Sequence, residues 1–442
     1  MDCRGRTATF FARCTVPVID SMTKNYRYFR MTGMILAALL IATVLPAGAA
    51  LAAGEPYTTL AISDDIDDTS PKVSWDATFA PGKENKFDAI APTADGGYIV
   101  LGSMLTADGE NREDLLLVKT DGRGDAIWMA EFPDMAPASV DAAADGGCIA
   151  GGYNVTRTIG DGNYIDQGSS FLIRIDAAGK EEWRQVLPGM KISSVRATPD
   201  GGYAAVGWLW SRSGSSDDVT AIIIKTDGNG TPAWNRTFSG ISANTGAVTA
   251  DGGYIIGGTT SPFNNTVGDA FLIRLDGDGN TVWHKNYHAP VVYDLEETAD
   301  GGFVYSGNYW YGLVDADGEE VWLRNMEGFT GHAVTLRPFG GYLVAGETRW
   351  TGEGFILGTD ADGMIQWNLT LPDSRVFAAC NVPGGYTLAG IQSSSPDAND
   401  AWLIGLEEEV PATPTPTAAP GFGATAAGAA LILLVAGRIR GR

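Results

Sequence analysis

Aromatic side chains are the strongest candidates for ligand contact in this sequence. Four apolar runs end at a glycine (Gly152, Gly207, Gly307 or Gly346), and Tyr or Trp follows within four residues. The residues concerned are Tyr153, Trp208, Trp210, Tyr309, Trp310 and Trp350, with Arg349 beside the last. Exposed Trp and Tyr rings commonly stack on sugars or anchor protein partners, so we predict that these aromatics bind a ligand. The alternative is that they fill gaps between neighbouring sheets.

Motifs for catalysis and metal binding are missing. The three histidines are His284, His288 and His332, and the sequence contains no HExxH, GxSxG or CxxC pattern. Zinc hydrolysis and serine–histidine chemistry therefore have no support. We predict neither catalytic residues nor a metal site.

Calcium is the one cofactor that remains as an alternative. Asp276, Asp278 and Asn280 alternate as oxygen donors do in calcium loops. The turn is short for such a loop, and a tight hairpin explains the same residues, because Asp bonds its own backbone and Gly adopts a positive φ. We therefore predict no cofactor.

These residues belong to a long internal repeat. The second glycine of a GGY-like element recurs in steps of 50, 55, 51, 49, 39 and 44 residues, at Gly97, Gly147, Gly202, Gly253, Gly302, Gly341 and Gly385. This period is typical of propeller blades or solenoid turns. In each copy, apolar runs alternate with Gly, Asp and Asn, which predicts four short strands and no helix. The third strand is apolar without alternation, as expected for a strand covered on both faces.

The tryptophan strand of the repeat decides between a ring and an open array. It occurs at Trp75, Trp128, Trp183, Trp234, Trp283, Trp322 and Trp367, so its first copy precedes the first GGY element and the last repeat lacks one. Pairing residues 73–79 with the strand near Trp402 would complete the last repeat and remove open sheet edges. We predict an all-β fold, a seven-bladed β-propeller of four-stranded blades over residues 72–408, closed by its N-terminal strand.

The DGGY-x-x-x-G, LIK-x-D-x-x-G and W-x-x-x-[FY] elements resemble those of repetitive cell-surface β-propellers of archaea and bacteria. The resemblance covers residues 70–408 and implies a fold rather than an activity. Blades five and six depart from the pattern, because Tyr309 to Leu313 runs almost directly into the third strand and Phe339 replaces the usual Asp.

A further likeness supplies an alternative function. The D-x-x-G-x-x-x-W element, as in Asp276 to Trp283, resembles the tryptophan-docking repeats of quinoprotein dehydrogenases and, more distantly, the Asp-boxes of sialidases. The resemblance implies a surface enzyme on the same scaffold, either quinoprotein-like or acting on glycans.

The predicted inner strands add a weaker candidate and two cysteines. Asp141, Arg196 and Glu296 occupy equivalent positions that would line a central channel, where solvated wall residues are the alternative. Cys148 and Cys380 fall on strands of different blades, so we predict two buried free thiols rather than a disulfide.

Both ends of the chain carry targeting signals. Residues 1–53 contain Lys and Arg, then an apolar run ending in Ala50-x-Ala52, which predicts a secretory signal peptide; an N-terminal membrane anchor is the alternative. Residues 54–71 form an acidic linker. Residues 409–420 form a Pro/Thr-rich spacer that is too poor in apolar residues to fold.

Residues 421–442 form an apolar segment that ends in arginines. Alone, this segment predicts a C-terminal membrane anchor. The order of spacer, Pro420-Gly421-Phe422, apolar tail and arginines resembles the archaeal PGF-type sorting signal, which implies cleavage and lipid attachment by an archaeosortase. Either way the propeller is expected outside the cell, held at the membrane.

Charge and glycosylation motifs agree with that location. The net charge is −23, which disfavours nucleic acid as a partner. Sequons at Asn154, Asn229, Asn235, Asn264 and Asn368 predict glycosylation. We therefore predict an exported, membrane-anchored cell-surface module that binds a glycan or protein ligand or serves in the envelope.

Overall fold

The computed structural model describes residues 70–82, 84–105, 113–154, 169–213, 216–260, 268–395 and 398–408. All of them belong to the unit Pro56–Arg442. Residues 1–53, most of the linker 54–71, the spacer 409–420, the segment 421–442 and Asn264 lie outside the described residues. Within the described part, no helix could cross a membrane.

The described residues form 27 strands and no helix. Blade one consists of β2 (Asn85–Pro92), β3 (Tyr98–Leu105), β4 (Glu113–Thr120) and β5 (Ala126–Phe132). Blade two consists of β6 (Met135–Ala142), β7 (Cys148–Asn154), β8 (Ser170–Ile175) and β9 (Glu181–Leu187). Blade three consists of β10 (Met190–Ala197), β11 (Tyr203–Ser213), β12 (Ser216–Thr226) and β13 (Pro232–Ser239). Blade four consists of β14 (Ser242–Val248), β15 (Tyr254–Thr259), β16 (Ala270–Leu275) and β17 (Thr281–Tyr287).

Blades five and six share one strand. Blade five consists of β18 (Asp294–Glu297), β19 (Phe303–Ser306), β20 (Asn308–Val314) and the first part of β21 (Glu320–Leu336). The second part of β21 pairs with β22 (Tyr342–Thr348), followed by β23 (Gly354–Thr359) and β24 (Ile365–Leu371), so the two blades form a single seven-stranded sheet. The irregularity that the sequence indicated in this region therefore takes the form of a continuous outer-to-inner strand.

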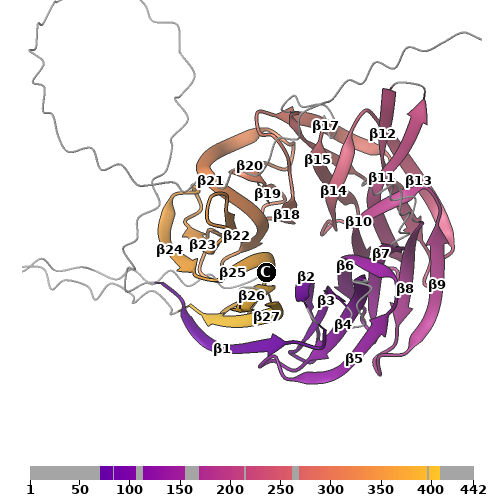
Figure 1. Ribbon diagram of the computed structural model, residues 1–442. Coiled ribbons are helices and arrows are strands. Elements are labelled where there is room, and N and C mark those ends of the chain that lie inside the picture. Colours follow the sequence, from indigo (N-terminus) through magenta and orange to yellow (C-terminus); the bar gives the residue numbers. More distant parts are fainter. Residues whose placement is uncertain are drawn as a thin grey trace, which may run out of the picture. The chain divides into compact units, whose positions relative to one another are not determined.

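Blade seven confirms the predicted closure. It consists of β25 (Ser374–Val382), β26 (Gly385–Ser395), β27 (Ala398–Glu407) and β1 (Lys72–Phe79), the N-terminal strand. β1 pairs antiparallel with β27, with Thr78 opposite Trp402, and Figure 1 shows the indigo strand beside the yellow one. The innermost strands contact one another in the closed order β2, β6, β10, β14, β18, β21, β25 and back to β2. The fold is therefore the predicted seven-bladed β-propeller.

The hydrophobic core lies between neighbouring blades. Middle strands such as β16 are buried along their whole length, whereas most residues of outer strands such as β17 are exposed or half-buried. One core cluster joins Leu117 of blade one to Phe171 of blade two, and another joins Phe87 of blade one to Leu403 of blade seven. Cys148 and Cys380 are free and buried, as predicted.

Candidate functional site

The antiparallel order of each blade gives the propeller two different faces. Turns between the first and second strands and between the third and fourth strands lie at one end of the blade, which we call the turn face. Connections between the second and third strands, and from one blade to the next, lie at the other end, which we call the loop face. Because every blade starts with its inner strand, this division holds around the ring (Figure 1).

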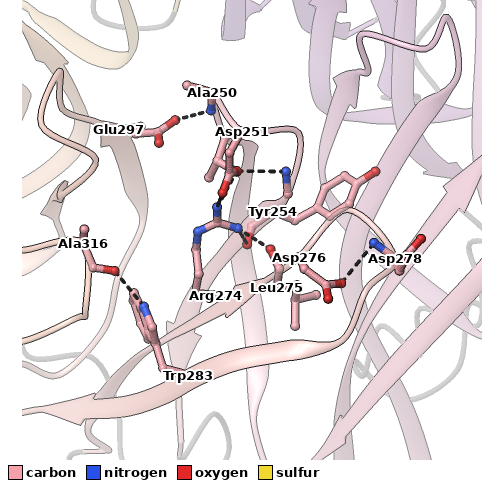
Figure 2. Close-up of polar contacts among 12 residues, drawn as sticks. Ala250, Asp251, Tyr254, Arg274, Leu275, Asp276, Asp278, Trp283, Glu297 and Ala316 are labelled. Atoms are coloured by element: carbon pink, nitrogen blue, oxygen red, sulfur yellow. Dashed lines mark hydrogen bonds and ion pairs between the residues drawn. The ribbon is translucent and has the colours of Figure 1, made fainter.

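The aspartates of the turn face are engaged by their own turns. Asp276 Oδ1 accepts hydrogen bonds from the backbone N–H groups of Asp278 (3.0 Å) and Asn280 (2.8 Å), and Figure 2 shows the first. The Asn280 side-chain amide donates to the other carboxylate oxygen (3.0 Å). These bonds, with the Asn280 side chain first, lower the pKa of Asp276. Among the described residues, no group of three or more His, Cys, Asp or Glu side chains could hold a metal ion.

The tryptophans of the outer strands dock on the following blade. The Trp283 indole N–H of blade four donates to the Ala316 carbonyl of blade five at 2.9 Å (Figure 2). Its ring lies against Gly318, where an added Cβ would come within 3.0 Å of the ring and where φ is +74°. Only glycine satisfies both conditions. The spacing of the D-x-x-G-x-x-x-W element is therefore explained by blade-to-blade docking.

A buried cation lies beneath the DGG turn in four blades. In blade four, Arg274 on β16 donates to both carboxylate oxygens of Asp251 at 2.5 and 2.6 Å. Figure 2 shows this pair. The equivalent pairs are Lys119 with Asp95, Arg174 with Asp145 and Lys225 with Asp200. A Lys or Arg recurs at one position of the third strand, and this is the one sequence signal from which the pairs could have been predicted. They stabilise the turn face rather than offering it to a ligand.

The three predicted channel residues connect neighbouring inner strands. Asp141 Oδ2 accepts a hydrogen bond from the backbone N–H of Ala197 at 2.8 Å, and Glu296 Oε2 accepts one from Leu336 at 3.3 Å. Burial raises the pKa of both carboxyl groups. Arg196 donates to the Ser139 hydroxyl of the preceding blade at 3.3 Å. The two carboxylates thus satisfy backbone N–H groups of the next inner strands, and all three contacts join neighbouring blades.

The predicted aromatic residues of the loop face fall into two groups. At the seam between blades two and three, Lys191 Nζ lies 4.8 Å from the Tyr153 ring centroid and 5.7 Å from that of Trp208. Tyr153 and Trp208 are half-buried, and Trp210 is 39% exposed. This seam is filled largely by contacts among its own side chains.

The second group lies at the seam between blades five and six. The Arg349 guanidinium lies 5.2 Å from the Tyr309 ring centroid and 5.5 Å from that of Trp350, and it donates a hydrogen bond to the Tyr309 hydroxyl. Trp350 is 83% exposed. Trp310 differs from both, because it is half-buried and packs on the core cluster that contains Leu323.

The backbone of Tyr309 is strained. Its φ is +65°, a region that L-residues other than Gly, Asn and Asp rarely adopt. Asn308 fixes the turn, because its side chain donates to the Tyr293 hydroxyl at 3.1 Å and accepts from the Thr330 hydroxyl at 3.2 Å. Strain of this kind persists where the surroundings hold it, and it concentrates at functional sites. Tyr309 therefore stands at a position where a glycine would be less strained.

The predicted glycosylation sites differ in exposure. Asn154, Asn229 and Asn235 are exposed, whereas Asn368 is 8% exposed and therefore buried on β24.

Comparisons with known proteins support the fold. No protein family and no curated protein matches the chain. The WD40 domain of Neurospora crassa Pan2 is 11% identical with a TM-score of 0.50, over 78% of this chain and 98% of that domain. A protein of unknown function from Bacteroides caccae is 14% identical with a TM-score of 0.38, over 55% of this chain and 82% of its own. The likeness to the WD40 domain is one of fold, and it agrees with the propeller assignment.

Proposed function

We propose that this protein is an exported, membrane-anchored binding module of the cell surface, which holds a glycan or protein ligand on its loop face. One observation carries the proposal. Trp350 presents most of its indole to solvent beside the Arg349 guanidinium, at a seam where Tyr309 is held in a strained conformation. A large exposed ring fixed in this way is costly in water, and such rings anchor ligands.

The first and last strands of the described propeller support an outward-facing loop face. β27 ends at Glu407 and β1 begins at Lys72, and these two residues are paired. Both positions lie on the turn face, because β27 is a third strand and β1 a fourth strand. An anchor in residues 421–442, whether retained or replaced by lipid through an archaeosortase, would thus attach through the turn face. The loop face is then the face opposite the point of attachment.

The net negative charge of the chain disfavours acidic partners. At a net charge of −23, nucleic acid and polyanionic ligands are repelled. On the turn face, four Asp side chains are paired with buried Lys or Arg side chains of their own blade, as in the Asp251–Arg274 pair. The loop face is therefore the proposed ligand surface.

Binding of the purified full-length protein to an array of glycans and envelope proteins tests the function. Trp350→Ala should weaken binding of the captured ligand at least about tenfold, because exposed aromatic anchors dominate interface energy. Trp210→Ala is the matched control, since it removes a less exposed tryptophan from another seam of the same face. Equal losses in both variants, or none in either, would contradict a site at blades five and six.

Cell fractionation and protease treatment of intact cells that express the protein test its export and anchoring. The full-length chain should fractionate with membranes and be cleaved by protease added to intact cells. A chain ending at residue 408 should appear in the medium. Retention of that truncated chain inside the cell would refute the proposed role of the N-terminal segment in export.

A further inference from the structure

A polar cavity opens on the loop face, one seam away from the Trp350 site. It has a volume of about 230 Å³ and lies between blades six and seven. Three connections contribute its lining: residues 351–353 of blade six, the interblade segment 373–375, and the β26–β27 hairpin with Ser393 and Asn399. At the seams containing Trp208 and Trp350, the equivalent connections carry aromatic side chains instead.

Trp350 and this cavity lie on opposite sides of one hydrogen-bonded hairpin. Residues 348–353 join β22 to β23, and the turn is closed by hydrogen bonds from Thr348 N to Glu353 O (2.8 Å) and from Gly352 N to Thr348 O (2.9 Å). On the side toward blade five, Arg349 N donates to Gly328 O at 2.8 Å. On the side toward blade seven, Arg375 Nε donates to Gly352 O at 3.2 Å. A ligand that crosses this hairpin would contact the indole and the cavity together.

The cavity offers both hydrogen-bond donors and acceptors. Ser393 donates its hydroxyl hydrogen to Asn399 Oδ1 at 3.0 Å, which fixes the Asn399 amide with its NH₂ group as donor. Asp373 is exposed at a φ of +54°. Among the described residues no hydrogen bond to its carboxylate is formed, whereas its backbone carbonyl is bound by Ser393 N at 2.7 Å.

The charges of the cavity disfavour an acidic ligand. Glu353 and Asp373 contribute two carboxylates. The one guanidinium, that of Arg375, is already paired with Glu347 at 3.3 Å. An additional acidic group would therefore meet net negative charge, whereas neutral hydroxyl groups can donate to the carboxylates and accept from the Asn399 amide.

We propose that this cavity is a subsite for one residue of an uncharged oligosaccharide whose adjacent residue stacks on Trp350. Sugars combine a polar rim of hydroxyl groups with an apolar ring face, which are the two properties that the cavity and the indole recognise. This inference rests on the proposed function, and it assigns a ligand class to that loop face.

Titration calorimetry with neutral hexose oligosaccharides of one to four residues, and with uronic-acid oligosaccharides of the same lengths, tests the subsite. Neutral chains of two or more residues should bind, and acidic ones should not. Asp373→Asn should weaken binding about tenfold, because it replaces a charged acceptor. Asn adopts positive φ readily, so this variant keeps the backbone. Ser393→Phe should block the cavity and abolish the gain in affinity from the second residue. Phe339→Ala, which removes an exposed aromatic side chain from the turn face, should bind as the parent does.

The outcomes separate this inference from the proposed function. Neutral oligosaccharide binding that depends on Trp350 but is unchanged in Asp373→Asn and Ser393→Phe would overturn the subsite and leave the function intact. Trp350-dependent binding of a protein or an acidic glycan would overturn the ligand class only. If no ligand of the array depends on Trp350, both proposals fall.

Discussion

The two faces of the propeller use the same residue types in opposite ways. On the turn face, Trp283 donates its indole N–H to the next blade and Asp276 accepts from its own turn, and both contacts recur around the ring. On the loop face, Trp350 is 83% exposed, more than any other large hydrophobic side chain of the described residues. The difference teaches that a tryptophan docked on the next blade belongs to the scaffold, whereas one that remains exposed, such as Trp350, is available to a ligand.

The largest expected effect is the loss of stability when a turn-face tryptophan is replaced by alanine. Trp322 is 7% exposed and donates its indole N–H to Ala361 O at 3.1 Å. Trp322→Ala should lower the free energy of unfolding by about 3–5 kcal/mol, because it leaves a cavity in the core. Trp350→Ala should change it by no more than about 0.5 kcal/mol, as expected for a surface substitution. Chemical denaturation measures both.

In a binding assay the order of the two variants should be reversed, with Trp350→Ala causing the larger loss of affinity. Trp322→Ala that still folds should keep the parent affinity, since its side chain lies away from the loop face. If Trp350→Ala proves as destabilising as Trp322→Ala, the tryptophans of both faces belong to the scaffold and the contrast between the faces is wrong.

Much of the fold could be predicted because the recurrent residues have the same structural role in each blade. Gly318 and Trp283 repeat because each docking contact needs a glycine at positive φ and an indole at one distance. The closing strand could be predicted for the same reason, since Trp75 is a displaced copy of that element. The continuous strand β21 was only signalled as an irregularity, because its shared pairing with β20 and β22 depends on tertiary geometry.

The candidate site could be predicted only in part. Tyr309 and Trp350 were predicted from their aromatic type, and the structure brings them together on Arg349. Trp310 was grouped with them, yet it lies half-buried against the core. The cavity could not be predicted, because Asp373 and Asn399 are ordinary polar residues whose proximity arises only when blade seven closes against blade six.

A smaller effect is expected from relieving the strain at Tyr309. Tyr309→Asn places a residue that tolerates positive φ at a φ of +65°, so the free energy of unfolding should rise by about 0.5–1 kcal/mol while ligand affinity falls. Tyr153→Asn is the control, because Tyr153 lies in the extended strand β7 and gains no such relief. Denaturant unfolding measures the gain in stability, and the binding assay measures the loss of affinity. Destabilisation of both variants by the same amount would show that strain at Tyr309 carries no cost.

The smallest effect concerns the acid limit of the turn face. The Thr198 hydroxyl, followed by the Lys225 ammonium, lowers the pKa of Asp200 to about 2, below the ordinary Asp value of about 3.9. Because the folded pKa is the lower one, Asp200 stabilises the fold fully above pH 4, and this contribution is lost as the pH falls from about 4 to about 2. The Asp200 side chain is 65% exposed, so solvent screening limits the contribution to about 0.5 kcal/mol. Asp200→Asn should therefore flatten the dependence of unfolding free energy on pH across that interval. Parallel curves for the parent and the variant between pH 4 and pH 2 would mean that the Asp200–Lys225 pair fixes the turn geometrically without an electrostatic contribution to stability.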